Sequence, residues 1–393
     1  MAQQLSPSSS DDSLTDSSGC CGVIASLLFA SVLVIAAIAV GFVLVSGPSD
    51  RWQGIADSTA HPLALITDPR HPQTVYVGTE QGHVLISHDG GQNWQEAHAG
   101  LPLHTPISAL ALLPDGTRIL AGTSKGTYLS SDEGKTWSSA GLGIPLHTIV
   151  DAVAALPNGA LLAGTAGSGV YVLPPGGSTW VTATTGLPPQ SDIYAFLPLA
   201  QRGHVLAALI NGGIYASQDS GMTWVESDLG LSGASGVNVF SFLAIPGEHG
   251  EDSFILAGTS RGVFNSRDSG ATWAPSSAGI GTTRVISLAR DPVTPTVVVA
   301  GADTGVYLSQ DGGAAWRVLG FGLPAEQHTG AVGVVHPVGS EQVVLASVDR
   351  LYRYPGQWLL ASEPWRALGF GVLIVLAFAL IAFVVWQVRT IRA

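Results

Sequence analysis

Tryptophan recurs along this sequence at a nearly constant spacing. Intervals of 42 to 49 residues separate the members of the series, which are Trp52, Trp94, Trp137, Trp180, Trp224, Trp273, Trp316 and Trp358. Each interval holds the same features in the same order. An apolar segment comes first, then a segment that ends in Gly-Thr, a turn, a segment that ends in Ser-x-Asp, and a last segment that begins with Trp. In the second unit these are "ISALALLP", "RILAGTS", "GTYLSSD" and "TWSSAG". The chain is therefore built from a repeated unit.

Four short strands in each unit of 40 to 50 residues are typical of a β-propeller blade. A helical solenoid would need a 3.6-residue periodicity, which the units lack. We predict an all-β, seven-bladed β-propeller of four-stranded antiparallel blades over residues 51–362, flanked by two transmembrane α-helices. Two segments could close the ring. Either "RWQGIAD" at 51–57 completes the last blade, or "QWLLASEP" at 357–364 does.

One octapeptide, for example "SQDSGMTW" at 217–224, stands between the third and fourth strands of a unit. Asp and Ser side chains accept hydrogen bonds from nearby backbone N–H groups, and Gly adopts the positive φ that such a turn requires. Trp is expected to pack between blades. The five complete or nearly complete copies comprise Ser87, Asp89, Gly91, Trp94, Ser130, Asp132, Gly134, Trp137, Ser217, Asp219, Gly221, Trp224, Ser266, Asp268, Gly270, Trp273, Ser309, Asp311, Gly313 and Trp316. Weaker copies are "LPPGGSTW" at 173–180 and "YRYPGQW" at 352–358.

The pattern S-x-D-x-G-x-T-W resembles the Asp-box, or BNR repeat. This repeat occurs in sialidases, some inverting glycoside hydrolases, sortilin-type receptors and photosystem II assembly and stability factors. The units "GTSRGVFNSRDSGATW" and "GADTGVYLSQDGGAAW" are most similar to the last group, whose propellers also have seven blades. In this superfamily the boxes lie at the periphery of the blades and hold turns together. The resemblance thus implies structural box aspartates, not catalytic ones.

Two apolar segments are long enough to cross a membrane as helices. They are residues 23–46 and 367–388, and the second is framed by Trp365, Trp386 and several arginines. We expect a disordered acidic tail at 1–22 and a short basic tail at 389–393. The positive-inside rule does not decide the orientation of these two spans, because Arg51 after the first span offsets Arg389 and Arg392 after the second. The two spans predict a multi-pass protein of the cell membrane. The absence of Cys and the scarcity of Lys in the propeller favour an extracytoplasmic propeller, with cytoplasmic termini.

The acidic balance of the chain excludes some partners. Lys and Arg total 16 and the net charge is −12, which argues against a nucleic-acid partner. No H-E-x-x-H or H-x-H spacing, phosphate loop or nucleophile elbow occurs in a suitable context, so no metal, cofactor or catalytic residue is predicted. The two cysteines, Cys20 and Cys21, precede the first apolar segment, so the propeller contains no disulfide.

In a propeller, the turns between second and third strands share one face with the connections between blades, and the boxes occupy the other. We predict that a ligand binds on the face opposite the boxes. Its candidate residues in the turns are Glu80, His83, Lys125, Arg261, Asp303, Asp349 and Arg350. The connections add His104, Asp151, Asp192, Arg284 and His328.

Two functions are compatible with these observations. The first is a non-catalytic binding or scaffold module for a protein or peptide, similar to the photosystem II assembly factors, although this acidic chain has no evident basic patch. The second is a surface glycoside hydrolase, sialidase-like or inverting, that acts on carbohydrate. An inverting hydrolase needs two carboxyl groups about 6.5–9.5 Å apart, one of them with a raised pKa. No Arg-[Ile/Val]-Pro motif of the sialidase type occurs.

Overall fold

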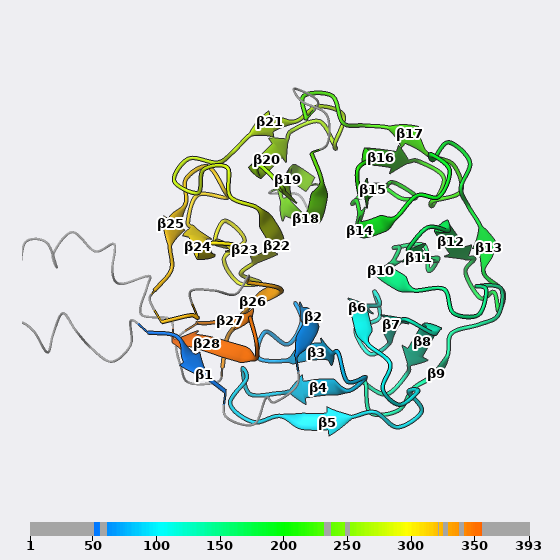
Figure 1. Cartoon of the computed structure of the whole chain (residues 1–393), viewed down its shortest axis with the longest axis horizontal. Helices are drawn as coiled ribbons and strands as arrows, with labels where there is room; N and C mark the ends of the chain where they lie inside the picture. The colour runs from blue at the N-terminus through cyan, green and yellow to red at the C-terminus, as the bar shows by residue number, and fades with distance from the viewer. Residues whose placement is uncertain are drawn as a thin grey trace, which may run out of the picture. The chain divides into compact units, whose positions relative to one another are not determined.

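Seven four-stranded antiparallel sheets surround a central axis, as Figure 1 shows, which confirms the predicted seven-bladed propeller. The structure is a computed structural model that describes residues 51–55, 61–231, 237–247, 252–320, 322–324, 329–337 and 342–355. Blades 1 to 6 each consist of four consecutive strands, beginning with β2–β5, and blade 7 combines β26–β28 with β1. Consecutive hairpins explain the antiparallel order within each blade.

The strands occupy equivalent positions in every blade. The innermost strands are β2 (Pro62–Thr67), β6 (Ile107–Leu112), β10 (Val150–Ala155), β14 (Ile193–Pro198), β18 (Val239–Pro246), β22 (Val285–Arg290) and β26 (Val332–Val335). The second strands are β3 (Val75–Thr79), β7 (Ile119–Thr123), β11 (Leu161–Thr165), β15 (Val205–Leu209), β19 (Asp252–Thr259), β23 (Val298–Ala302) and β27 (Val343–Ser347). The third strands are β4 (Val84–Ser87), β8 (Gly126–Ser130), β12 (Gly169–Leu173), β16 (Gly213–Ser217), β20 (Gly262–Ser266), β24 (Gly305–Ser309) and β28 (Leu351–Pro355). The outermost strands are β5 (Gln95–Ala97), β9 (Ser138–Ser139), β13 (Val181–Thr182), β17 (Val225–Glu226), β21 (Ala274–Pro275), β25 (Arg317–Val318) and β1 (Gln53–Gly54).

The N-terminal strand closes the ring. β1 pairs with β28 through Gln53 opposite Arg353, so "RWQGIAD" and not a later segment supplies the outermost strand of blade 7. Trp52 is buried, and its indole Nε1 donates a 2.9 Å hydrogen bond to the carbonyl of Leu319 in blade 6. Trp52 therefore fills the tryptophan position of the seventh blade. The alternative segment at 357–364, with Trp358, lies outside the described residues.

The hydrophobic core lies between neighbouring blades. Second strands such as β11 are buried at every residue, and each inter-blade cluster holds the Trp of the later blade, for example Trp224 between blades 3 and 4. The recurrent Gly-Thr has a packing role here. A Cβ on Gly78 would lie 2.7 Å from a side-chain methyl of Ile107 in the next blade, so only glycine allows this approach. Thr79 then accepts the N–H of His83 and donates to its carbonyl, which closes the turn.

No described residue belongs to a helix that has the length and apolarity for a membrane crossing. The predicted spans at 23–46 and 367–388, with both tails, lie outside the described residues. The described residues all belong to one compact unit, residues 50–356.

Candidate functional site

The box loops and the hairpins between first and second strands share one face of the ring, called here the box face. In blade 4, Ser220 within the box donates its N–H to the carbonyl of Gly203 in the β14–β15 hairpin. Equivalent bonds join Glu133 to Thr117 and Gly312 to Thr296. The box loops therefore lie at the ends of the blades opposite the connections between blades.

In each complete box, the Asp carboxylate accepts hydrogen bonds from residues of the same loop. In blade 4, Ser217 Oγ donates to Asp219 Oδ1 at 2.8 Å, and the N–H groups of Met222 and Thr223 donate to the same oxygen. Thr223 Oγ1 donates to Asp219 Oδ2 at 2.6 Å, while Gly221, at φ 88°, donates its N–H to Ser217 Oγ. These hydrogen bonds stabilise the turn between Ser217 and Thr223.

Hydrogen bonding keeps the box aspartates ionised. Partial burial alone would raise the pKa of Asp219, but the bonds from Thr223, Ser217 and Met222 lower it below the ordinary value. In blade 2 the bonds from the side chain and backbone of Thr136 lower the pKa of Asp132 to about 2. A carboxylate that already accepts three or four hydrogen bonds is poorly suited to exchange protons with a substrate.

The tryptophans of the boxes tie neighbouring blades together. Trp224 Nε1 donates to the carbonyl of Ala183 in blade 3 at 3.0 Å, and its backbone N–H donates to Thr185. Trp180, whose box has lost Ser and Asp, makes the same kind of bonds to Ala140 and Leu142 in blade 2. Burial and these bonds explain why Trp persists where the box does not.

On the other face, called here the connection face, the turns between second and third strands contact the connections between blades. Ile210 donates its N–H to the carbonyl of Asp192, and Asp303 donates to Arg284. The predicted ligand residues therefore lie on this face in three separate groups. Their pairings are His83 with Glu96, Asp303 with Arg284 at 3.0 Å, and Asp349 with Tyr352 at 3.0 Å and with Arg350 at 3.5 Å.

Of the remaining predicted residues, Asp151 and Asp192 lie near the Arg284 group, because Asp192 acts electrostatically on Asp151, and Asp151 and Arg284 both act on Tyr194. Glu80, Lys125 and Arg261 are exposed turn residues, and His104 is exposed in a connection. His328 lies outside the described residues. Asp151 was expected in a connection between blades. It lies instead within the innermost strand β10, which already begins at Val150.

Innermost strands carry a β-bulge at the same register in six blades. In β14, Ile193 pairs with Leu209 and Ala195 with Ala208, so Tyr194 has no opposite residue. Such an insertion redirects one side chain and is frequent next to binding sites. The residues at this position, which we call the bulge ring, are Leu63, Ser108, Asp151, Tyr194, Phe240 and Ile286.

Each residue of the bulge ring is the second residue of its innermost strand, next to the connection that enters the blade. Its members are at least partly exposed, whereas the residues before them in β10, β14 and β18 (Val150, Ile193 and Val239) are buried. The strands that carry them are the innermost of their blades and surround the central axis (Figure 1). The bulges thus place a different side chain from each blade at equivalent positions.

A chain of contacts crosses blades 4 to 6 in this region. The rings of Tyr194 and Phe240 meet edge to face with centroids 5.5 Å apart. The guanidinium carbon of Arg284 lies 5.9 Å from the centre of the Phe240 ring, and Arg284 pairs with Asp303. An aromatic pair flanked by a cation is a surface suited to apolar and aromatic side chains of a partner.

Acidic groups border the aromatic pair on its other side. Burial raises the pKa of Asp151 above its ordinary value, and the negative charge of Asp192 raises it further. Burial also raises the pKa of Tyr194, as does Asp151, whereas Arg284 acts in the opposite direction. A bound cation beside Asp151 would relieve this unfavourable concentration of negative charge.

The sequence analysis missed Leu63, Ser108, Tyr194, Phe240 and Ile286, although a signal exists. Every bulge residue follows an apolar residue or Pro and precedes Ala or Ser, as in "IYAF", "VFSF" and "VISL". The small residue after the bulge breaks the two-residue alternation of a strand. In blade 7, Val332 and Gly333 pair regularly with Ala346 and Leu345, so no bulge forms.

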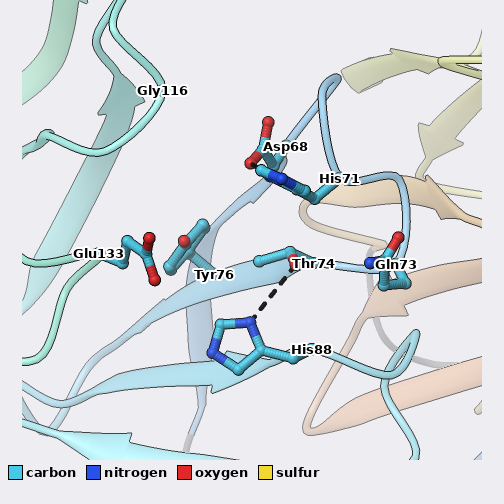
Figure 2. A pocket seen from close by; sticks show the side chains of 8 residues that line it. All are labelled: Asp68, His71, Gln73, Thr74, Tyr76, His88, Gly116 and Glu133. Atoms are coloured by element: carbon cyan, nitrogen blue, oxygen red, sulfur yellow. Dashed lines mark hydrogen bonds and ion pairs between the residues drawn. The ribbon is translucent and has the colours of Figure 1, made fainter.

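A polar cavity of about 200 Å³ opens on the box face between blades 1 and 2. Figure 2 shows Asp68 beside His71, and Glu133 beside the phenol of Tyr76. Burial, Asp68 and Glu133 together raise the pKa of Tyr76 to about 12. Asp68 accepts hydrogen bonds from the Arg70 N–H and from His71, both at 2.8 Å, so it is occupied within its own hairpin. The bulge ring is therefore the stronger candidate for a binding site.

Sequence comparison places the chain among known propellers. The family of DUF6242 beta propeller domains matches residues 70–282, more than half of the 393 residues. The chain belongs to this family. No curated protein sequence matches it.

Solved structures share the fold of this DUF6242 propeller at low sequence identity. YCF48 from Cyanidioschyzon merolae is 16% identical, with a TM-score of 0.55, over 78% of this chain and 99% of that one. YCF48 bound to a D1 peptide is 17% identical, with a TM-score of 0.58, over 78% and 96%. An ancestral GH74 enzyme is 18% identical, with a TM-score of 0.59, over 77% of this chain and 46% of its own. The chain thus spans about half the length of the GH74 enzyme, and these likenesses support the fold.

Proposed function

We propose that this chain is a non-catalytic peptide-binding propeller, held at a membrane, that uses the bulge ring and its charged neighbours as the binding surface. The observation that carries the proposal is the common register of the six bulges. The backbone feature repeats from blade to blade, whereas the side chain that it presents differs in each. Repeated geometry with variable chemistry is the arrangement expected of a recognition surface on a rigid scaffold.

The chemistry of this surface suits an extended segment that carries a basic side chain next to an apolar or aromatic one. Asp151 and Asp192 supply negative charge, and the raised pKa of Asp151 indicates that a cation would be favoured there. Tyr194 and Phe240 supply the apolar contact. Aromatic side chains and fully desolvated charge pairs contribute most of the binding free energy at such interfaces.

The comparisons and the sequence support this proposal from different directions. YCF48, which shares the fold, binds a D1 peptide. The apolar segments at 23–46 and 367–388 would anchor both ends of the chain in the cell membrane, with the propeller outside the cytoplasm. A scaffold that binds a segment of a membrane-protein partner during assembly combines these properties.

The test uses the full chain in detergent and a panel of nine-residue peptides. Each peptide carries one Lys or Arg and one Leu or Phe at varied spacing, and matched peptides carry Glu instead of the basic residue. We expect the basic peptides to bind more tightly, and Asp151→Asn to weaken them at least about tenfold while it leaves the Glu peptides unchanged. Val225→Ala, exposed on β17 of blade 4, is the matched control. No preference between the panels, or equal binding by Asp151→Asn, would contradict the proposal.

A second candidate function is carbohydrate hydrolysis, favoured by the same carboxyl groups. Asp151, whose pKa is raised, and Asp192, whose negative charge contributes to that rise, could supply the acid and the base of an inverting glycosidase. Tyr194 and Phe240 could stack on a sugar ring. Turnover of any member of a polysaccharide panel, abolished in Asp151→Asn and retained in Val225→Ala, would favour the hydrolase over the binding module.

A further inference from the structure

Two histidines and a glutamate meet on one face of blade 1, at its outer edge. β4 and β5 pair with Leu85 opposite Glu96 and Val84 opposite Ala97. Continuing this register brings His83 opposite His98. Because side chains alternate between the two faces of a strand, His83, Glu96 and His98 lie on the same face, away from the buried Val84.

The three side chains are close enough to share one ion. One ligand atom from each lies within 4.8 Å of the others. His83 Nδ1 contacts the Glu96 carboxylate, and the two imidazole rings lie 5.1 Å apart at 31°. Ligand atoms around a tetrahedral zinc ion stand roughly 3.4 Å apart, which follows from bonds of about 2.1 Å. The three side chains would have to move closer together to reach that spacing, and Glu96 and His98 are exposed while His83 is half-buried.

The backbone of the site is held by hydrogen bonds within blade 1. His83 donates its N–H to Thr79 Oγ1 and accepts from the same hydroxyl, both at 3.0 Å. Glu96 and His98 follow each other at two-residue spacing along and just beyond β5, which pairs with β4. Binding an ion would therefore require ordering of three side chains, not of a loop.

A simple ion pair between His83 and Glu96 does not account for the second histidine. Elsewhere in the chain, His71 pairs with Asp68 and His336 with Asp291, each at 2.8 Å. Those pairs lack a third metal-ligating side chain. Among the residues that the structure describes, the group at His83 is where three such side chains converge.

We propose that His83, Glu96 and His98 bind a divalent transition-metal ion of the zinc class and leave at least one coordination position open. Two imidazoles and a carboxylate are ligands that Zn²⁺, Co²⁺ and Ni²⁺ accept, whereas Mg²⁺ and Ca²⁺ prefer sites built from oxygen alone. The ion is held from the connection face, at the edge of blade 1, and not from the bulge ring. This assignment stands independently of the proposed peptide binding.

The test titrates the full chain, purified without a histidine tag and stripped with a chelator, with Zn²⁺ by calorimetry and with Co²⁺ by visible absorption. We expect one strong site per chain, d–d bands of Co²⁺ with nitrogen and oxygen ligands, and no strong binding of Mg²⁺ or Ca²⁺. His83→Ala, His98→Ala and Glu96→Gln should each weaken Zn²⁺ binding at least about tenfold, since removal of even an outer-shell partner costs 10- to 100-fold. His71→Ala is the matched control and should bind as wild type does.

Thermal melting in the presence of chelator shows whether each variant is folded. Glu96→Gln preserves shape and is the variant least disturbing to the strand. Strong Zn²⁺ binding that survives in both His83→Ala and Glu96→Gln, or no strong binding to the folded wild type, would overturn the assignment.

Discussion

The box face and the connection face are built from the same repeated unit but follow opposite patterns. On the box face, five blades repeat the same side chains in the same contacts, for example Ser217 to Asp219 in blade 4 and Ser130 to Asp132 in blade 2. On the connection face, the six bulges repeat a backbone conformation while the side chain changes from Leu63 to Asp151 to Phe240. The repeated side chains support the fold, and the variable ones remain available for recognition.

Blade 3 shows how far these contributions can be separated. Its loop at 173–180 has lost the box and is closed by a backbone bond from Gly177 to Pro174, yet Trp180 is as buried as Trp224. The tryptophan is therefore held by inter-blade packing, and the box adds local stability. Substitutions should separate these two contributions, with the largest loss in the free energy of unfolding at the tryptophans and the smallest change in the bulge ring.

Removal of an inter-blade tryptophan should have the largest effect. Trp224→Ala should lower the free energy of unfolding by about 3–5 kcal/mol, because it leaves a cavity between blades 3 and 4. Trp180→Ala should cost a similar amount despite its incomplete box. Denaturant unfolding followed by circular dichroism measures both, with Val225→Ala as the exposed control. A much smaller loss for Trp180→Ala would show that the box, and not packing, holds the tryptophan.

Removal of a box carboxylate should have an intermediate effect. Asp219→Ala leaves the N–H groups of Met222 and Thr223 without their acceptor in a solvent-accessible loop, so we expect a loss of about 1–2 kcal/mol. The exposed neighbour Gln218→Ala is the control and should change stability by less than about 0.5 kcal/mol. If both variants unfold at the same denaturant concentration, the box carboxylates do not stabilise the fold.

Acid should lower the stability of the box loops, because protonation of a box aspartate removes its contribution to the free energy of unfolding. Asp132 has a folded pKa of about 2, below its value in an unfolded chain, so its stabilising contribution is present above about pH 4. That contribution is lost as pH falls from there toward 2. Asp132→Asn should be less stable at neutral pH, and its stability should fall less steeply in acid. Unfolding midpoints measured across this range would contradict the prediction if the two slopes were equal.

Neutralising a bulge-ring carboxyl should have the smallest effect and the opposite sign. The pKa of Asp151 is raised in the folded chain, so ionisation at neutral pH destabilises the fold. Asp151→Asn should therefore melt at a slightly higher temperature at pH 7. The difference should shrink as pH falls through the raised folded-state pKa and should be lost below the ordinary Asp pKa of about 3.9. A lower melting temperature at pH 7 would show that the ionised carboxylate supports the fold.

Local interactions made much of this structure predictable from the chain itself. The Trp spacing predicted seven blades of four strands, and the box loops form their bonds within eight residues, as between Ser217 and Asp219. The polar residues of the turns, such as His83 and Asp303, were identified because they stand between recognisable strands. Their roles as ligand residues stay predictions.

Other features depended on residues far apart or on strand register. The sequence determined the repeat, the strands and the box turns, because these follow from spacing and from hydrogen bonds between near neighbours. Only the tertiary structure decided that Gln53 pairs with Arg353 to close the ring, that Tyr194 and Phe240 stand at bulges and contact each other, and that His83 meets His98. Each of these depends on which strand pairs with which and in what register, and no local residue pattern specifies that pairing.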